Sequence, residues 1–110
     1  MTKSRFGRGD VVQLRHDAKA DTLRLAVVIT PATYNASGLT VIAPIVQEKG
    51  SARYAGFVVD LPQSGIQTQG VVLCNQVRTI DLETRGAKRL ESLPEDFMDD
   101  VMARIRALFE

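Results

Sequence analysis

The sequence predicts a β-rich α+β fold, a small barrel or curled sheet followed by a C-terminal amphipathic helix. Short apolar segments rich in β-branched residues alternate with turn-forming residues over most of the chain, which is typical of strands. Near the C-terminus the apolar residues recur with the period of a helix instead. The 110 residues contain no internal repeat, low-complexity segment or linker. We therefore expect one domain over residues 1–110, with residues 1–8 as a flexible N-terminal extension.

Six segments have the length and composition of strands. They cover residues 11–14, 23–30, 39–46, 54–61, 70–73 and 77–82, with polar loops expected at 15–22 and 47–51 and a turn at Asn35, Ser37 and Gly38. The segment 23–30 is apolar at nearly every position, which is typical of a strand covered on both faces. Pro31 ends it because proline donates no ladder hydrogen bond. For the same reason, Pro44 is expected at a bulge or a strand end.

The final segment has the pattern of an amphipathic helix. Its apolar stripe consists of Phe97, Val101, Ile105 and Leu108, broadened by Met98, Met102 and Phe109. Ser92 and Glu95 form a capping-box pattern and Pro94 suits the first turn, so the helix is expected over residues 93–109. The stripe is wider than one barrel face would cover, and it predicts a homodimer.

Composition limits the classes of function. Fourteen basic and thirteen acidic side chains leave a formal charge of +1, so any nucleic-acid site must be a local patch. Because Cys74 is the only cysteine and His16 the only histidine, neither an internal disulfide nor zinc-ligand spacing is possible. No segment approaches the roughly 20 apolar residues of a membrane span, and residues 1–10 lack the apolar run of a signal peptide. These features predict a cytoplasmic protein without a metal or cofactor.

Several short motifs follow one another in a fixed order along the chain. They are Arg8-Gly9-Asp10-Val11-Val12, Arg24 before Ala26-Val27-Val28-Ile29-Thr30-Pro31, Tyr34-Asn35, Ala43-Pro44-Ile45, Ala52-Arg53-Tyr54-Ala55-Gly56-Phe57, Gly70-Val71-Val72-Leu73, Asn75-Gln76-Val77-Arg78, and Asp81-Leu82 with Arg85 and Ala87-Lys88-Arg89. In order and spacing, this set resembles the MazF/PemK-type toxins of bacterial toxin-antitoxin modules, nearest the Kid/PemK and ChpB toxins.

The resemblance implies a fold, an assembly and an activity. The implied fold is an SH3-like barrel of about six or seven strands with a C-terminal helix. The implied partners are a second copy of the chain and a cognate antitoxin whose disordered tail binds in a groove. The implied activity is metal-independent cleavage of single-stranded RNA. Such cleavage uses the RNA 2′-hydroxyl as nucleophile, so the site needs a proton acceptor, a proton donor and cationic groups that stabilise the phosphorane.

Three residues are the catalytic candidates, namely Arg24, His16 and Asn75. Arg24 matches the arginine before the second strand of the family and has a planar group suited to gripping phosphate, whereas the alternative is a strand-edge arginine paired with Asp21. His16 has a side chain suited to proton transfer, but it lies in a loop that is shorter than in relatives, and a surface role is the alternative. Asn75, with Gln76, either positions RNA or satisfies the backbone of a turn.

Four positions depart from the family pattern. Leu25 replaces a proline, and Val46 replaces a threonine whose hydroxyl helps to hold the reacting phosphate. Leu73 and Asn75 stand where Kid-like toxins carry an arginine and an aspartate for proton transfer, and ChpB-like toxins resemble this sequence there. These departures leave a second hypothesis open, a non-catalytic protein on the same scaffold that captures an antitoxin tail or blocks a target such as a topoisomerase.

A further set of polar and basic residues is predicted to contact RNA. It comprises Gln47, Lys49, Arg53, Gln69, Gln76, Arg78 and Arg85, with Lys88 and Arg89 completing a basic group drawn from several loops. A solvated rim is the alternative for this basic group. Tyr54 or Phe57 can offer a stacking face for a base, although Phe57 lies in a strand-like segment typical of the core. The antitoxin tail is expected near Arg24 and the loop 47–51, as a disordered acidic and apolar segment.

Overall fold

The computed structural model describes residues 5–16, 22–47, 57–62 and 64–110. Its elements are β1 (Asp10–Arg15), β2 (Leu23–Val28), α1 (Ala32–Asn35), β3 (Thr40–Val46), β4 (Val58–Asp60), β5 (Val71–Leu73), β6 (Arg78–Ile80), β7 (Lys88–Ser92) and α2 (Glu95–Ala107). The strands form one sheet in the order β4-β5-β3-β2-β1-β7, and β6 pairs with β3 beside this path. All of these strand pairs are antiparallel.

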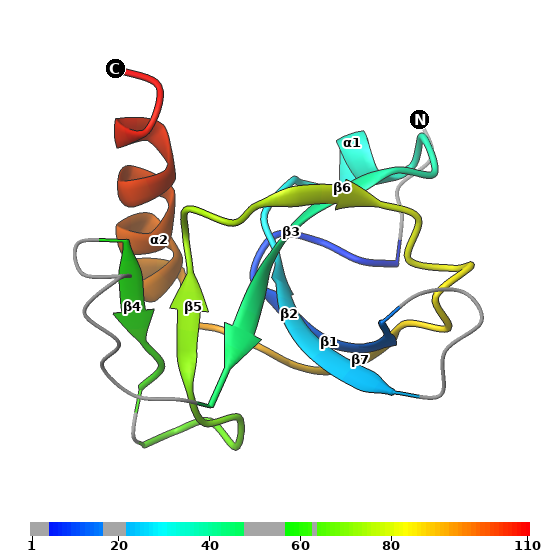
Figure 1. Ribbon diagram of the computed structural model, residues 1–110, viewed down its shortest axis with the longest axis horizontal. Helices are drawn as coiled ribbons and strands as arrows, with labels where there is room; N and C mark the ends of the chain where they lie inside the picture. Colours follow the sequence, from blue (N-terminus) through cyan, green and yellow to red (C-terminus); the bar gives the residue numbers. More distant parts are fainter. Residues whose placement is uncertain (1–4, 17–21, 48–56, 63) are drawn as a thin grey trace.

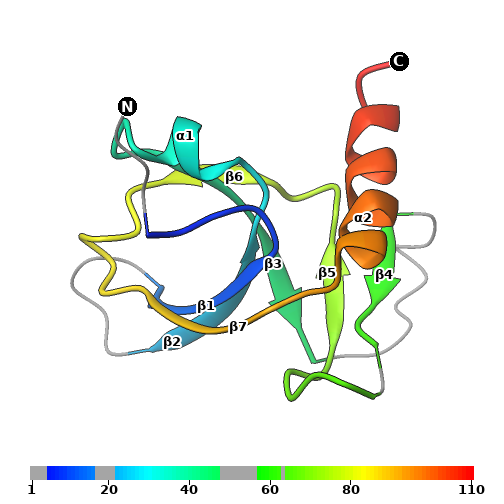
Figure 2. The same cartoon turned by 180° about the vertical axis from the view of Figure 1, so that it is seen from behind.

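The sheet curls strongly, and α2 stands beside β4 and β5 at one end of the molecule (Figure 1). The view from behind shows β7 running along β1 (Figure 2). In the strand order, β1 lies between β2 and β7. Within the described ranges, the strand path starts at β4 and stops at β7 without joining these two edges. The predicted α+β class with a C-terminal helix is confirmed, in the form of an incompletely closed barrel.

Two apolar clusters lie on opposite faces of the curled sheet. Because successive residues of a strand point to opposite faces, Val11 and Val27 belong to one cluster, whereas the adjacent Val12 and Val28 belong to the other. The first cluster also contains the buried side chains of α2, which are Met98, Val101 and Ile105. The second half of β2 is therefore covered on both faces, as its composition predicts.

Pro44 lies inside β3, so the expectation of a bulge or a strand end was wrong. It pairs in regular register with Ala26 of β2. On the other edge of β3, β6 pairs with residues 40–42 and β5 with residues 45–46. Pro44 thus lies where β3 has no strand partner on that edge in the described part of the chain. A position without a ladder partner tolerates a residue that lacks an N–H donor.

The start of α2 also differs from the expectation. The helix is slightly shorter than the predicted 93–109, and Pro94 is its N-cap residue. No side chain caps it, so the predicted capping box of Ser92 and Glu95 was wrong. Ser92 belongs to β7, where it pairs with Asp10 and donates its hydroxyl hydrogen to Asp10 Oδ1 at 2.7 Å. Its hydroxyl is therefore engaged in joining two strands.

Two elements of the structure, β7 and α1, were not predicted from the sequence pattern. The strand β7 has the sequence Lys-Arg-Leu-Glu-Ser and is mostly exposed, so it lacks the apolar pattern of a covered strand. It forms by pairing with β1 at the edge of the sheet, where charged side chains are favoured. The other element, α1, is a single helical turn in the region where only a turn was expected.

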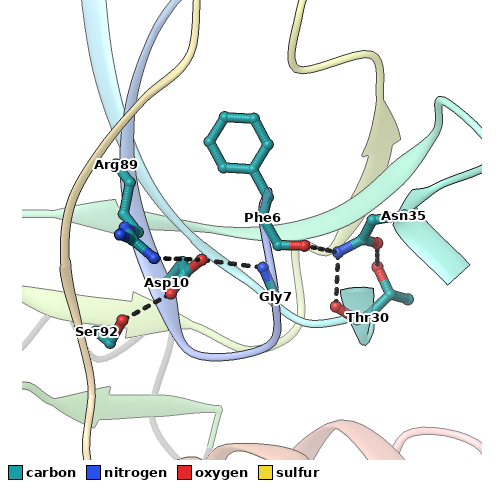
Figure 3. Close-up of polar contacts among 7 residues, drawn as sticks. All are labelled: Phe6, Gly7, Asp10, Thr30, Asn35, Arg89 and Ser92. Atoms are coloured by element: carbon teal, nitrogen blue, oxygen red, sulfur yellow. Dashed lines mark hydrogen bonds and ion pairs between the residues drawn. The ribbon is translucent and has the colours of Figure 1, made fainter. Parts of the chain in front are cut away.

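Phe6 and Gly7 are held against the sheet, which corrects part of the expected flexible extension. Phe6 is only 4% exposed and belongs to the second apolar cluster. The buried amide of Asn35 donates to the carbonyl oxygen of Phe6 at 2.9 Å, and the backbone N–H of Gly7 donates to Asp10 Oδ2 at 2.9 Å (Figure 3). The remainder of the expected extension lies outside the described residues. No helix in the described ranges is both long enough and apolar enough to span a membrane.

Candidate functional site

A cleft of about 260 Å³ lies at the ends of β1 and β2 and along β3. Buried apolar side chains of β2, β3 and β5 line its inner part, among them Ala26, Ile45 and Leu73. Its polar lining consists of Arg15, His16, Arg24, Gln76, Arg78 and Arg85. The cleft therefore brings together five residues that the sequence analysis selected from separate segments, and adds Arg15 to them.

Arg24 and His16 meet because β1 pairs with β2. Leu14 lies opposite Arg24 in the register, and His16, two residues beyond Leu14, continues the same face of the sheet. Arg24 Nε donates to His16 Nδ1 at 3.4 Å, a weak hydrogen bond between two exposed side chains. Nδ1 is the acceptor in this contact, so its lone pair faces the Arg24 guanidinium.

Two further arginines are held by backbone carbonyl groups beside this pair. Arg85 Nη1 donates to the carbonyl oxygen of His16 at 2.7 Å. Arg15 Nη2 donates to the carbonyl oxygen of Thr84 at 2.9 Å. Within the described ranges, no carboxylate lines the cleft and none of its arginines forms an ion pair. The cleft thus concentrates positive charge that the nearly neutral chain as a whole does not reveal, and it suits a phosphate.

Three of the four positions that depart from the family pattern form an apolar wall of this cleft. Val46 is half-buried and Leu73 is buried, and both line the cleft together with Leu25. None of these three side chains can donate or accept a hydrogen bond. Apart from the arginines, His16 is therefore the one titratable side chain that lines the cleft in the described part of the chain.

A second hollow of about 500 Å³ lies next to the cleft and contains Gln47 and Gln69. Leu25 lines both cavities, so the two are neighbours on the sheet. Glu91 accepts hydrogen bonds from the backbone N–H of Thr68 at 2.7 Å and of Gln67 at 3.0 Å, and a third from the Thr68 hydroxyl. These hydrogen bonds, that from the Thr68 hydroxyl foremost, lower the pKa of Glu91 because they stabilise its carboxylate.

Several other predicted residues lie elsewhere. Asn75 is exposed in the turn after β5 and does not line the cleft, whereas its neighbour Gln76 does. Lys88 and Arg89 are exposed on β7, outside both cavities, and Arg89 lies 3.9 Å from Asp10 as an ion pair. The exposed positions of Lys88 and Arg89 fit the alternative of a solvated rim. Phe57 is 37% exposed and so is not a core residue.

The predicted contacts Lys49, Arg53 and Tyr54, the loop 48–51 and the alternative Arg24 partner Asp21 lie outside the described residues. Arg15 is a cleft residue outside the predicted site, because the sequence pattern predicts a polar loop from residue 15 onward. Its position directly before His16, at the end of an apolar strand, was the available signal. No group of three or more potential metal-binding side chains occurs among the residues that the structure describes.

Comparison with known proteins identifies the family. Residues 7–109 match the family of PemK-like, MazF-like toxins of type II toxin-antitoxin systems. Endoribonuclease PemK of Escherichia coli is 40% identical over 111 residues, an alignment that covers 96% of this chain and 84% of PemK. Endoribonuclease toxin ChpB of Escherichia coli strain K12 is 38% identical over 113 residues, covering 98% of this chain and 97% of ChpB.

Solved structures share the fold. A MazE-MazF crystal structure from Deinococcus radiodurans matches with a TM-score of 0.82 and 30% identity, covering 94% of each chain. An endoribonuclease in complex with its cognate antitoxin from a mycobacterial species matches with a TM-score of 0.76 at 12% identity, covering 94% of this chain and 93% of that one, and shows the fold alone. Because the family match spans nearly the whole sequence, this chain belongs to the PemK-like, MazF-like toxins of type II toxin-antitoxin systems.

Proposed function

We propose that the chain is a metal-independent endoribonuclease that cleaves single-stranded RNA as the toxin of a type II toxin-antitoxin system. The observation that carries this proposal is the cleft, which places several arginines and one histidine around an apolar interior and which no carboxylate of the described residues lines. Such a cleft attracts the phosphate of RNA and stabilises negative charge that develops on it. The endoribonucleases PemK and ChpB, which are similar over nearly the whole chain, support the same activity.

Arg24 is the proposed phosphate-binding residue. It is exposed at the mouth of the cleft, and its only described hydrogen bond is the weak one to His16. An incoming phosphate can therefore take over its donors at little cost, and the two parallel N–H groups of a guanidinium match two phosphate oxygens. In the phosphorane the oxygens carry more negative charge than in the ground state, so this contact strengthens as the reaction proceeds.

His16 is the proposed proton acceptor for the 2′-hydroxyl. While Arg24 donates to Nδ1, this nitrogen is occupied and holds the guanidinium in place. When a phosphate draws the Arg24 donor away, the lone pair of Nδ1 becomes available to accept the proton of the 2′-hydroxyl as its oxygen attacks the phosphorus. The P–O5′ bond then breaks, and solvent water protonates the leaving 5′-oxygen. Arg85, which holds the carbonyl oxygen of His16, positions the histidine backbone during this exchange. Asn75, which does not line the cleft, has no part in this scheme.

The remaining contacts divide between the two cavities. Gln76, Arg78 and Arg85 line the cleft and would contact the nucleotides at the reacting phosphate. Gln47 and Gln69 line the neighbouring hollow and would contact the next nucleotide, since amide side chains hydrogen-bond base edges. Lys49 and Arg53 stay proposed RNA contacts on the basis of the family resemblance.

The proposal includes partners and a location. We infer a homodimer, because Phe109 at the end of the α2 stripe is 80% exposed and Leu108 is 37% exposed. We also infer a cognate antitoxin with an acidic and apolar tail, which would bind the cationic cleft near Arg24 and exclude RNA. The MazE-MazF complex of Deinococcus radiodurans supports this partner. We also infer a cytoplasmic location, because the proposed substrate is single-stranded RNA.

The proposed activity is tested by incubating the purified protein with long single-stranded RNA in excess EDTA and mapping the new ends. Cleavage at defined sites with 2′,3′-cyclic phosphate ends is expected. The matched control is the same RNA with one 2′-deoxynucleotide at the mapped site, which removes the nucleophile and should block that cut alone. Absence of cleavage across several RNAs, in a preparation that binds its antitoxin, would support the alternative of a non-catalytic binding protein. The apolar side chains of Val46 and Leu73 in the cleft favour that alternative.

A further inference from the structure

Arg15 lines the cleft but has no role in the proposed reaction. We propose that Arg15 binds a phosphate of the RNA backbone next to the one held by Arg24, and so sets affinity for the RNA strand rather than the rate of the chemical step. This inference rests on the proposed function. Four observations support it. They are the position of Arg15 in the cleft, the contacts that hold its side chain, its uncompensated positive charge and its separation from Arg24.

Backbone and side-chain contacts hold Arg15 in place at the end of β1. Its backbone N–H donates to the carbonyl oxygen of Arg85 at 2.9 Å, and its Nη2 donates to that of Thr84 at 2.9 Å. The guanidinium lies beside Gly86, where a Cβ atom would be 3.6 Å from both Nε and Nη2. Gly86 has a φ of +62°, the left-handed conformation that lets the 83–86 turn close against the strand. The Arg15 guanidinium is thus held only along the edge that carries Nε and Nη2.

The charge of Arg15 is not compensated in the described part of the chain. It forms no ion pair there, and its Nε is buried without a hydrogen-bond acceptor. A buried donor without a partner is unfavourable, and an arginine that served only the fold would be expected to have its buried donors satisfied. Because the positive charge is delocalised over the guanidinium, an anion at its cleft-facing edge compensates the whole group. Among the groups that RNA offers, phosphate supplies this charge.

The contacts also separate Arg15 from Arg24. Arg24 contacts the imidazole of His16, Arg85 contacts the carbonyl oxygen of the same residue, and Arg15 contacts Thr84, the neighbour of Arg85. Arg15 adjoins His16 in the chain, but successive residues of a strand point to opposite faces, so the Arg15 guanidinium leaves β1 away from the His16 imidazole and lies against the 83–86 turn. A phosphate bound by Arg15 would therefore be a different phosphate from the reacting one at Arg24 and His16. Arg15 is thus a positioning residue for the RNA strand.

The test measures binding of a single-stranded oligonucleotide that carries 2′-deoxynucleotides and is not cleaved, at several salt concentrations. Each phosphate contact in a single strand contributes about 0.7 to the slope of log affinity against log salt. Arg15→Gln should lower this slope by about 0.7 and weaken binding by about tenfold at moderate salt, since a charged hydrogen bond is lost. Arg15→Lys, which keeps the charge, should retain the slope. The matched control is Arg106→Gln, which removes one exposed arginine of α2 outside the cleft and should change neither quantity.

Cleavage kinetics separate this role from a catalytic one. For Arg15→Gln the rate at saturating RNA should equal that of the wild type, while KM rises. An unchanged slope in Arg15→Gln would overturn the inference, and so would a loss of rate at saturating RNA. If Arg15→Gln fails to fold by circular dichroism, Arg15→Met removes the same charge with a side chain that keeps the apolar stem. A wild type that binds no RNA at any salt would overturn the proposed function, and this inference with it.

Discussion

Replacing Arg24 with alanine should abolish RNA cleavage while leaving the fold intact. The side chain is exposed, and its one described hydrogen bond is the 3.4 Å contact with His16. Arg24 also lies opposite Leu14 in the β1-β2 ladder, which is maintained by backbone groups that alanine retains. Surface substitutions of this kind usually change the free energy of unfolding by less than about 0.5 kcal/mol. The expected loss is therefore confined to function.

The size of the functional loss follows from the role of the guanidinium. Removal of one donor to a developing oxyanion costs a factor of about 10² to 10³ in rate, equivalent to roughly 2.7–4 kcal/mol. Arg24→Ala removes a charge as well as a forked donor, and no other side chain in the described part of the cleft contacts His16 Nδ1. We expect a loss at or above the upper end of this range.

The assay is a time course on one RNA with a single mapped site, using wild type, Arg24→Ala and Arg106→Ala. Arg106 is an exposed arginine of α2 outside the cleft, so its substitution controls for the loss of one positive charge. Thermal unfolding followed by circular dichroism establishes that all three proteins are folded. Cleavage by Arg24→Ala within tenfold of the wild type would show that the reacting phosphate is bound elsewhere.

Four further predictions concern single residues. Val46→Thr should raise the cleavage rate, because it adds a hydroxyl to a half-buried position that lines the cleft; an unchanged rate in the same time course would contradict this role. Folding lowers the pKa of Glu91, chiefly through the Thr68 hydroxyl, so its stabilising contribution is fully present above the ordinary value of 4.5 and is lost as the pH falls through the lower folded value. The urea midpoint of the wild type should therefore exceed that of Glu91→Gln near neutral pH and converge with it in acid, and a pH-independent difference would be the wrong outcome for this linkage. Burial raises the pKa of Cys74 to about 11, so iodoacetamide should modify it only after unfolding, and rapid labelling of native protein would disprove this protection. Phe109→Glu should shift the protein from dimer to monomer in light scattering, whereas a monomeric wild type would exclude the proposed dimer.

The sequence alone determined the elements whose side chains face apolar surroundings. Val11, Val27 and Val101 have no exposed surface, and each lies in an apolar segment whose period had predicted its strand or helix. The order of motifs likewise indicated the family, which the comparisons confirm. Local pattern is informative in these cases because burial imposes it directly on the chain, with a period of two in strands and 3.6 in helices.

Elements that depend on distant partners could not be predicted in this way. The charged strand β7 exists because β1 offers it a free edge, and Ser92 is drawn away from the helix start by Asp10, 82 residues earlier. Pro44 is tolerated inside β3 because β6 and β5 pair with the two ends of this strand and, among the described residues, none pairs with Pro44 on that edge. Each of these outcomes depends on which strands are neighbours, a property that no single segment contains.

The candidate site shows the same division. The residue types at Arg24 and His16 suggested phosphate binding and proton transfer, and the resemblance matched Arg24 to an arginine of the family. Only the pairing of β1 with β2 established that Arg24 reaches His16 Nδ1, and only the turn at residues 83–86 brought Arg15 and Arg85 to the same cavity. Asn75 lies in the turn after β5 and does not line that cavity, although its neighbour Gln76 does. Sequence thus supplied the chemical groups, and the tertiary structure decided which of them share one cleft, because that depends on long-range strand pairing.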